Sequence, residues 1–430
     1  MRALVLLAMR SAWSRRFTLS LTIGAVALST VLLLATERLR HDVRRSFSQA
    51  LSGTDLVVGA RGSPTQLLLY AVFHIGQPTL GVSLKRVEAL ADLPQVAWVV
   101  PLALGDSFRG FPVIATDERF LRHVQVGDRQ PLRIAQGRGL GTPPADSAPD
   151  TGAEPRLDAL IGAQVARALG LRVGDRVTLA HGSGPLATGG HDEQPFEVIG
   201  VLAASGSPVD RSVLISLESM HALHAGWVAG VRPKRSQIAG GDSRARPSMV
   251  SAALVGLHSR STVFSVQRRL QSERDEPLTA ALPGVTLDEL WQALALGEAA
   301  LRLLGALVAL ASLAGLVSVI LASLEARRRE LAILRSVGAS PVTLLGLLAA
   351  EGTLATLAGM ALGTVLGAAL LGVASAPLQA SYGITLSTEP PRAGEWLLLG
   401  AILATGMLAS LIPAWRAWRL SLADGLSPRQ

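Results

Sequence analysis

Four long runs of apolar residues alternate with segments that mix polar and apolar positions. Each run holds at least about 20 predominantly apolar residues, the length that an α-helix needs to cross the hydrocarbon core of a bilayer. The sequence therefore predicts transmembrane helices over residues 17–37, 301–325, 342–378 and 396–415. Trp396 and Trp415 bound the last run, and tryptophan at both ends of a run is typical of the membrane–water interface.

The first run also has features of a cleaved signal peptide, because Ala25-Val26-Ala27 resembles a cleavage site. That triplet lies in the middle of an uninterrupted apolar stretch, which is longer than the core of a usual signal peptide. We therefore expect a retained transmembrane helix.

Short flanking segments indicate the orientation, because short cytoplasmic loops carry an excess of positive charge. Arginines are concentrated in residues 1–16, 326–341 and 416–430, whereas residues 379–395 are net negative. Four arginines that follow the first run argue the other way, but long domains are translocated largely regardless of charge. The sequence predicts that both termini lie in the cytoplasm and that residues 38–300 form a periplasmic domain.

Residues 38–300 show the patterns of a folded α+β domain. Period-two runs predict strands over residues 55–59, 96–100, 111–115, 176–180, 196–202, 212–215 and 249–257. Amphipathic runs predict helices over residues 38–51, 83–90, 157–169 and 262–273. Gly, Pro, Asp and Ser crowd together at 137–155, and a second loose stretch covers 230–247. These breaks predict two subdomains, with the second, at about 156–248, inserted into the first.

Composition agrees with a membrane protein and excludes several kinds of site. Hydrophobic residues make up 49% of the chain, and the mean hydropathy is +0.39. The net charge of +8 comes almost entirely from arginines spread along the chain, so we expect no nucleic-acid partner. The absence of cysteine excludes disulfides, thiolate catalysis and thiolate metal sites.

Residues 326–340 carry the strongest functional signal, because dense arginines are combined with an ordered set of apolar residues. If this segment is helical, its apolar residues form a ridge flanked by arginines, which suits a groove on a soluble partner. A generic positively charged loop would explain the arginines, but it would not explain the ridge. The candidate coupling residues are Arg328, Arg329, Glu330, Leu331, Ile333, Leu334, Arg335, Val337 and Gly338.

The third run contains two further features of interest. Gly359, Gly363 and Gly367 recur every four residues, which favours close helix packing, although glycine is also common in spanning helices generally. Glu351 is a carboxylate in or near the membrane, where an unpartnered charge is costly. A structural role near the cytoplasmic end is favoured for Glu351 over substrate or proton binding.

Histidines offer a weak signal for metal binding. His221 and His224 are three residues apart on a predicted helix, and His181 and His191 lie nearby in the sequence. Such side chains can bind zinc, but their spacing is not that of a fixed site. We favour solvated histidines, and no catalytic constellation can be identified from spacing.

Residues 328–340, Arg-Arg-Glu-Leu-Ala-Ile-Leu-Arg-Ser-Val-Gly-Ala-Ser, resemble the cytoplasmic segment before the third helix of the FtsX-like permease superfamily of ATP-binding-cassette systems. This group includes the macrolide-exporter and lipoprotein-release permeases. Residues 413–417, Pro-Ala-Trp-Arg-Ala, resemble the ending of the family, and one helix, a large domain and three further helices is the family plan. The resemblance is specific over residues 296–430. Residues 55–63 and 73–78 resemble the corresponding segments of a distinct subgroup of this superfamily.

The resemblance implies a bacterial inner-membrane permease without its own ATPase site, and the chain contains no Gly-x-x-x-x-Gly-Lys-Ser/Thr motif. It further implies a second permease subunit, identical or homologous, and two copies of a cytoplasmic ATPase that binds ATP and Mg. A periplasmic or lipoprotein partner is also expected. No cofactor is expected in this chain.

Three functions of different classes follow as hypotheses. The first is a transport subunit that uses ATP-driven motion to extract or export an amphipathic, lipid-linked or peptide-like cargo. The second is a signalling coupler that activates a periplasmic partner such as a cell-wall hydrolase. The third and weakest is a metal-handling component that uses the histidines.

Overall fold

The computed structural model describes residues 16–76, 80–142, 157–182, 195–224, 246–273, 276–326, 338, 340–382, 386 and 390–419. The chain divides into two compact units. The helical unit comprises Met1–Asp42, Leu294–Pro377 and Leu386–Gln430, and the α+β unit comprises Val43–Ala293 and Leu378–Thr385.

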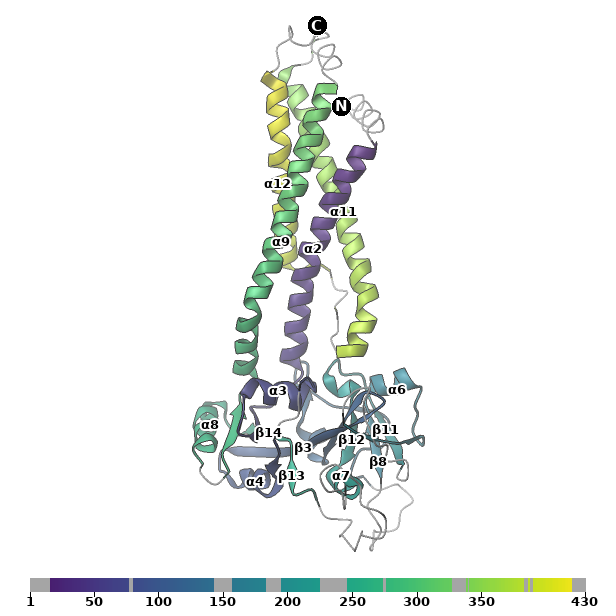
Figure 1. Ribbon diagram of the computed structural model, residues 1–430, viewed down its shortest axis with the longest axis vertical. Coiled ribbons are helices and arrows are strands. Elements are labelled where there is room, and N and C mark those ends of the chain that lie inside the picture. Colours follow the sequence, from purple (N-terminus) through teal and green to yellow (C-terminus); the bar gives the residue numbers. More distant parts are fainter. Residues whose placement is uncertain are drawn as a thin grey trace. The chain divides into compact units, whose positions relative to one another are not determined.

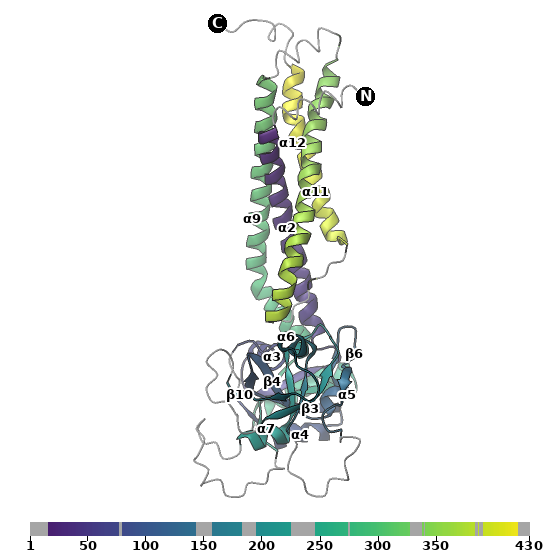
Figure 2. The ribbon, with the colours of Figure 1, turned by 90° about the vertical axis from the view of Figure 1, so that its right-hand side faces the viewer.

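Four long helices lie alongside one another in the helical unit (Figures 1 and 2). They are α2 (Arg16–Gln49), α9 (Pro283–Ala326), α11 (Pro341–Tyr382) and α12 (Ala393–Arg419), and α2 and α9 extend into the α+β unit. Among the described residues, these four helices are long and apolar enough to cross a membrane. The predicted set of four apolar helices, the first near the N-terminus, is confirmed. The helix expected over 38–51 is continuous with the first span, because nothing in the sequence interrupts α2 between them.

The α+β unit is built on a twisted mixed sheet. In the described part of the chain, its strand order is β15-β1-β14-β3-β4-β12-β8-β11-β7, with β10 beside β3 and β9 beside β11. These strands are β1 (Leu56–Ala60), β3 (Val96–Phe108), β4 (Phe111–Thr116), β7 (Ile134–Gly137), β8 (Asp158–Ile161), β9 (Arg176–Val177), β10 (Ala180–His181), β11 (Phe196–Leu202), β12 (Val213–Ser216), β14 (Ala252–Leu257) and β15 (Leu278–Ala281). Two small pairs complete the strands, β2 (Val82–Ser83) with β13 (Met249–Val250) and β5 (Gln125–Val126) with β6 (Gln130–Pro131).

Short helices accompany the sheet. They are α3 (Pro64–Phe73), α4 (Leu84–Glu88), α5 (Arg119–His123), α6 (Ala163–Leu169), α7 (Leu217–His224) and α8 (Val263–Ser272), with 3₁₀ turns η1 (Ala89–Asp92), η2 (Pro208–Arg211) and η4 (Arg260–Thr262). The sequence analysis did not anticipate α3. Its start is encoded locally, because the Ser63 hydroxyl accepts a hydrogen bond from the Gln66 amide and Pro64 occupies the first turn.

Both faces of the sheet are buried. Along β1, Leu56 and Val58 belong to one hydrophobic cluster while Val57 belongs to the other. Strand β12 repeats this alternation, with Val213 and Ile215 on one side and Leu214 on the opposite side. Because successive side chains of a strand point to opposite faces, two clusters require two covering layers. Helices α4, α7 and α8 contribute to the first cluster, and α3 and α5 contribute to the second.

The helix expected over 157–169 is wrong in its first part. Residues Asp158–Ile161 form strand β8, which pairs with β11 in parallel and with β12 in antiparallel orientation, and the helix begins only at Ala163. Gly162 makes the transition, since a Cβ added there would lie 2.3 Å from the Asp210 carbonyl oxygen. Strand partners distant in the sequence override the local helical spacing of the apolar residues.

The strands of the sheet fall on either side of two central strands. Strands β15, β1 and β14 lie on one side, and β12, β8, β11 and β7 lie on the other, with β3 and β4 between them. Strands β4 and β7 precede residue 156, and they pair with β12 and β11 respectively. The second half of the sheet therefore includes pairings with strands that precede residue 156, the predicted start of the second subdomain.

Candidate functional site

The predicted coupling segment leads into α11. Its residues Arg328 to Val337 lie outside the described residues, whereas Gly338 has a φ of +100°. Nothing lies within 4 Å of a Cβ added at Gly338, so backbone conformation alone restricts this position to glycine. Two residues later, the Ser340 hydroxyl accepts a hydrogen bond from the Thr343 amide at 3.2 Å, and Pro341 begins α11. The segment thus meets a helix that has an ordinary N-terminal cap.

The glycines of the third run lie against α2. A Cβ on Gly359 would lie 2.7 Å from the Val26 side chain, and one on Gly363 would lie 2.7 Å from the Ala27 carbonyl oxygen. Gly367 is looser, with the Val31 Cα at 4.0 Å. At Gly359 and Gly363 the absence of a side chain permits the close approach of the two backbones. Glu351, on the same helix, is half-buried.

Buried ion pairs connect α2 with α12 in the helical unit. The Arg38 guanidinium donates to both carboxylate oxygens of Glu395, at 3.1 Å and 2.8 Å, and the side chains are only 13% and 5% exposed. Arg392 binds Asp42 at 3.1 Å. Bidentate pairs of this kind fix orientation as well as distance. The sequence analysis treated Arg38 only as flanking charge, although Glu395 at the edge of another apolar run was a usable signal.

Arg40 adds a second set of contacts in the same region of α2. It donates to Glu37 at 2.6 Å and lies 3.9 Å from Glu298 of α9. Three of the four long helices are therefore connected through charged residues that flank the apolar runs.

Two of the four candidate metal-binding histidines, His221 and His224, have side chains that the structure describes, and both lie on α7. His191 lies outside the described residues, His181 lies on β10, and His221 is half-buried on α7. His224 Nε2 lies 3.3 Å from the buried Asp106 carboxylate, and its Nδ1 is 3.0 Å from the Met220 carbonyl oxygen. Among the described residues, no group of three histidine or carboxylate side chains could hold a metal ion.

The environment of His224 favours its charged form. Burial opposes the charge, but the hydrogen bond and the negative charge of Asp106 outweigh burial and raise the pKa of His224. This histidine is therefore part of a structural ion pair that holds the end of α7 against β3.

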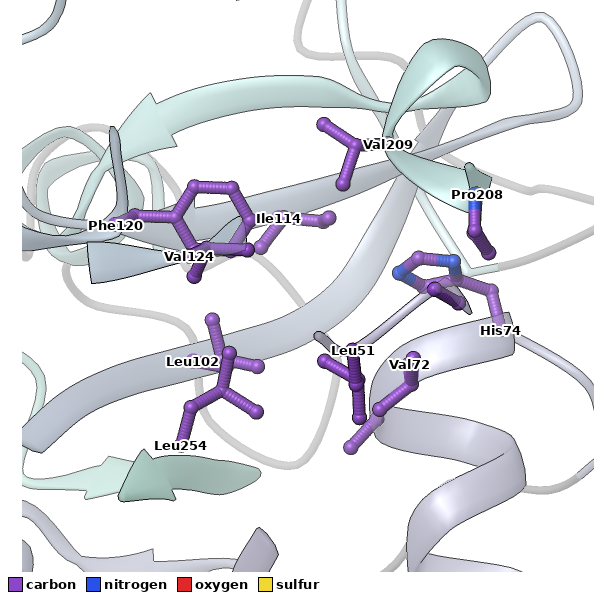
Figure 3. A pocket seen from close by; sticks show the side chains of 12 residues that line it. Leu51, Val72, His74, Leu102, Ile114, Phe120, Val124, Pro208, Val209 and Leu254 are labelled. Carbon is purple, nitrogen blue, oxygen red and sulfur yellow. The ribbon is translucent and has the colours of Figure 1, made fainter. Parts of the chain in front are cut away.

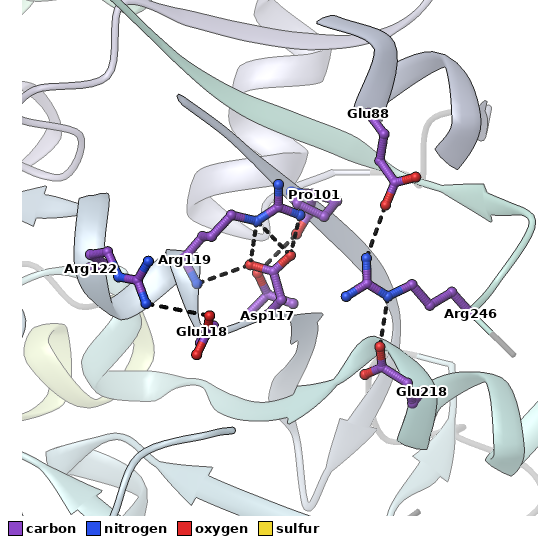
Figure 4. Close-up of polar contacts among 9 residues, drawn as sticks. Glu88, Pro101, Asp117, Glu118, Arg119, Arg122, Glu218 and Arg246 are labelled. Atoms are coloured by element: carbon purple, nitrogen blue, oxygen red, sulfur yellow. Dashed lines mark hydrogen bonds and ion pairs between the residues drawn. The ribbon is translucent and has the colours of Figure 1, made fainter. Parts of the chain in front are cut away.

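Arg246 connects the two halves of the sheet through their helices. Its guanidinium donates to Glu218 of α7 at 2.7 Å and to Glu88 of α4 at 2.9 Å, as Figure 4 shows. Nearby, Arg119 and Arg122 pair with Asp117 and Glu118 around α5 (Figure 4). Because Glu88 and Glu218 are far apart in the sequence, no local pattern revealed this bridge.

Comparisons with known proteins identify the family. The family model of the MacB-like periplasmic core domain matches residues 17–272, more than half of the chain, and the model of the FtsX-like permease C-terminal domain matches residues 302–422. A comparison with curated protein sequences gives no match.

The solved structures that resemble this chain include two extracytoplasmic domains. The periplasmic region of MacB from Actinobacillus actinomycetemcomitans shares 13% identity, with 56% of this chain and 94% of that chain covered and a TM-score of 0.32. The extracellular domain of the noncanonic ABC-type transporter YknZ from Gram-positive bacteria shares 14% identity, with 52% and 98% covered and a TM-score of 0.29. On the two family matches, which together account for the domain and the helices, the chain belongs to the FtsX-like permease superfamily and is a multi-pass permease component of an ATP-binding-cassette transporter.

Proposed function

We propose that this permease subunit transmits ATP-driven motion from a separate cytoplasmic ATPase to its α+β unit, to extract or export an amphipathic, lipid-linked or peptide-like cargo. The observation that carries the proposal is the continuity of two helices. Helix α2 runs unbroken for 34 residues and α9 for 44 residues, and each includes an apolar span. A continuous helix moves as a rod, because each backbone hydrogen bond connects successive turns.

Both helices are anchored in the α+β unit by aromatic contacts. Phe47, near the end of α2, stacks on Phe73 with 4.2 Å between ring centroids. Trp291, in the first part of α9, lies edge-on to Phe47 at 5.6 Å. Leu287 of α9 is buried in the same cluster. Motion of either helix would thus act on the core of the domain and not on a flexible connection.

Residues 326–340 would supply the docking element for the ATPase. The apolar residues Leu331, Ile333, Leu334 and Val337 would bury in a groove of that partner, while Glu330 and Arg335 would pair at its rim. ATP and Mg would be bound by two copies of the partner ATPase, and a second permease subunit would complete the complex. Permease components of this family lack their own ATPase site, so we expect the purified chain alone to hydrolyse no ATP.

We place the chain in the bacterial inner membrane with both termini in the cytoplasm. Reporter fusions test this orientation. A fusion at Asp146 should be active only with a periplasmic reporter, and a fusion at Arg328 only with a cytoplasmic one. A cytoplasmic signal at Asp146 would contradict the proposed orientation.

The transmission itself can be tested with a single spin label, because the chain has no native cysteine. Arg268→Cys on the exposed side of α8 would carry the label. We expect ATP to change the label spectrum in the complex of permease and ATPase. The double variant Leu39→Pro and Leu296→Pro, which breaks α2 and α9, should retain ATP hydrolysis but lose this response.

Leu39→Ala with Leu296→Ala is the matched control, because both side chains are exposed (39% and 81%) and alanine preserves a helix. A proline variant that still responded to ATP would show that the helices do not carry the motion. Identification of co-purifying proteins by mass spectrometry would then distinguish a transported cargo from the periplasmic partner of a signalling coupler.

A further inference from the structure

The cavity beside His74 is too small to hold a ligand. It lies between the sheet and the helices of the second cluster, where His74 lies beside Pro208 and Val72 (Figure 3), and it admits only about one or two water molecules. His74 ends α3 in the left-handed conformation, and its Nε2 atom has no hydrogen-bond partner in the described part of the chain. Burial, and after it the positive charge of Arg211, lowers the pKa of His74 to about 4, so the imidazole is uncharged at neutral pH. A further binding site of this unit is therefore expected on its surface.

Helix α8 presents an exposed side that packing within the domain does not use. Its inward residues Val266 and Leu270 belong to the first cluster, and each is only 2% exposed. Phe264 lies on the other side and is 63% exposed. Among the described residues of the α+β unit, it is the one phenylalanine, tyrosine or tryptophan that is more than a third exposed. Burial in the core therefore accounts for Val266 and Leu270, and it does not account for Phe264.

Arginines flank Phe264 on this exposed side. Arg268 follows it by four residues and so lies on the same face of the helix, and Arg269 is exposed beside Arg268. Arg260 precedes it in η4, where Asp55 binds the guanidinium at 3.3 Å although the side chain stays 67% exposed. In the described part of the chain, neither Arg268 nor Arg269 pairs with a carboxylate. Arg260, Phe264, Arg268 and Arg269 are here called the basic face of α8.

The charge of this face specifies the chemistry of a partner. Helix α8 itself contains no acidic residue, and Glu273, which follows it, is already paired with Arg86. Aromatic residues and arginine are enriched in protein interfaces, and complementary charges favour association of the two surfaces. A partner for the basic face therefore needs carboxylates around an apolar pocket.

Two other occupants fit the basic face less well. A helix that lies in a membrane interface inserts its whole apolar side, but Val266 and Leu270 are buried in the protein and leave a single ring for insertion. A second copy of the chain would bring the same surface of both subunits together across a two-fold axis. Arginines would then meet arginines, and such like-charge contacts oppose association.

We infer that the basic face of α8 binds an acidic periplasmic protein, with the Phe264 ring in an apolar pocket and Arg268 paired with a carboxylate at the rim of that pocket. The inference concerns the α+β unit alone and does not depend on docking of an ATPase. It applies to a partner in transport and to a partner in signalling. Only the compartment of the partner rests on the proposed orientation, which the reporter fusion at Asp146 tests separately.

Photo-crosslinking in cells identifies the partner. The full chain carries p-benzoylphenylalanine in place of Phe264, which retains an aromatic ring at an exposed position. We expect a light-dependent adduct with an acidic protein, which mass spectrometry then identifies. The same photoreactive residue in place of Val173, exposed between α6 and β9, is the control. A phospholipid adduct, an adduct with a second copy of the chain, or no adduct above this control would overturn the inference.

Binding of the captured protein must also depend on the basic face, because capture alone does not establish recognition. The captured protein is purified and titrated onto the purified full chain. Phe264→Ser should raise the Kd at least about tenfold, as expected for a buried aromatic anchor. Arg268→Glu should raise the Kd about tenfold at low salt and less at high salt, because salt screens exposed charges. Arg268→Lys keeps the charge and should raise the Kd by about threefold or less.

Folding of these variants can be checked separately. Phe264 and Arg268 are both exposed, so Phe264→Ser and Arg268→Glu should unfold within about 2 °C of wild type. If Phe264→Ser failed to fold, the Arg268 variants and the salt dependence of binding would decide the inference by themselves.

Matched variants elsewhere separate the basic face from general changes of the surface. Val173→Ser removes an exposed apolar side chain and Arg172→Glu reverses an exposed charge, both between α6 and β9. Helix α8 packs on β15, at one end of the sheet path, whereas α6 packs near β11, toward the other end. These variants should change the Kd by about twofold or less. Equal binding by wild type and Phe264→Ser, or equal effects of Arg268→Glu and Arg172→Glu, would overturn the inference.

Discussion

The helical unit and the α+β unit bury their residues in different ways. In the α+β unit, large side chains such as Phe196 and Leu160 are fully buried. In the helical unit, glycines such as Gly363 lie where an added Cβ would come within 2.7 Å of the neighbouring helix, while Leu303 is 62% exposed. Outward-facing large side chains and inward-facing small ones are typical of helices that contact lipid. Removing volume should therefore damage one unit, and adding volume should damage the other.

Loss of a buried ion pair should have the largest effect on the free energy of unfolding. Glu395→Gln leaves Arg38 buried without its anionic partner, and we expect the free energy of unfolding to fall by about 4 kcal/mol. The matched change in the α+β unit is Glu118→Gln, whose pair with Arg122 is largely exposed and should contribute about 0.5 kcal/mol or less. Unfolding in detergent micelles measures both. Equal effects would contradict the difference in burial between the two pairs.

Truncation of a buried side chain should have the next largest effect on the free energy of unfolding. Leu160→Ala empties a fully buried position on β8, and we expect a loss of about 3–4 kcal/mol. Leu303→Ala removes the same atoms from an exposed position on α9 and should cost about 0.5 kcal/mol or less. Thermal unfolding of the two variants in the same detergent compares them directly. A larger loss for Leu303→Ala would mean that the exposed face of α9 is covered in the functional assembly.

Two histidines of the α+β unit should give opposite dependences on pH. The pKa of His74 is lowered to about 4, so the unfolded state binds more protons between about pH 6.5 and 4. The contribution of His74 to the free energy of unfolding is thus fully present above pH 6.5, and about 2–3 kcal/mol of it is lost as the pH falls toward 4. The pKa of His224 is raised, so its contribution is present at low pH and lost as pH rises through that pKa.

Denaturation of His74→Gln and His224→Gln across this range separates the two. His74→Gln should flatten the decline of stability at acidic pH, whereas His224→Gln should flatten the decline at higher pH. If His74→Gln left the acidic decline unchanged, the neutral, buried state assigned to this imidazole would be incorrect.

Addition of a side chain at a glycine of α11 should have the smallest effect on the free energy of unfolding. Gly363→Leu would force α11 away from the backbone of α2, and we expect a loss of about 2 kcal/mol together with a lower yield of folded protein. Gly372→Leu on the same helix meets nothing within 4 Å and should be neutral or slightly stabilising. Size-exclusion profiles and unfolding midpoints compare the two variants. Equal tolerance would mean that the helices do not depend on close backbone contact.

Sequence patterns predicted the helical unit better than the α+β unit, for a physical reason. A membrane span is defined by its own length and hydropathy, so α9 and α12 could be assigned without knowledge of their neighbours. Strand β8 could not, because its pairing with β11 and β12 depends on residues distant in the chain. Helix α3 was overlooked although Ser63 and Pro64 form a recognisable start.

The candidate sites follow the same division. The glycines of α11 were found from spacing alone, since local periodicity defines a helix face, whereas the coupling segment stays a prediction. The Arg246 bridge and the Arg38–Glu395 pair depend on tertiary contacts. His74 was noted in the sequence only as part of residues 73–78, the segment assigned to a distinct subgroup, and no role was predicted for it. Its left-handed backbone and unpartnered nitrogen are properties of the folded chain.

Co-purification with the partner ATPase tests the central claim, that this chain is a coupling subunit driven by a separate enzyme. A tagged chain should recover the ATPase, and Leu334→Asp should reduce recovery by at least about tenfold, as expected for a buried anchor worth about 2 kcal/mol. Arg328→Ala, a rim charge, should reduce recovery by about threefold or less. Normal recovery with Leu334→Asp, or ATP hydrolysis by the purified chain alone, would contradict the account.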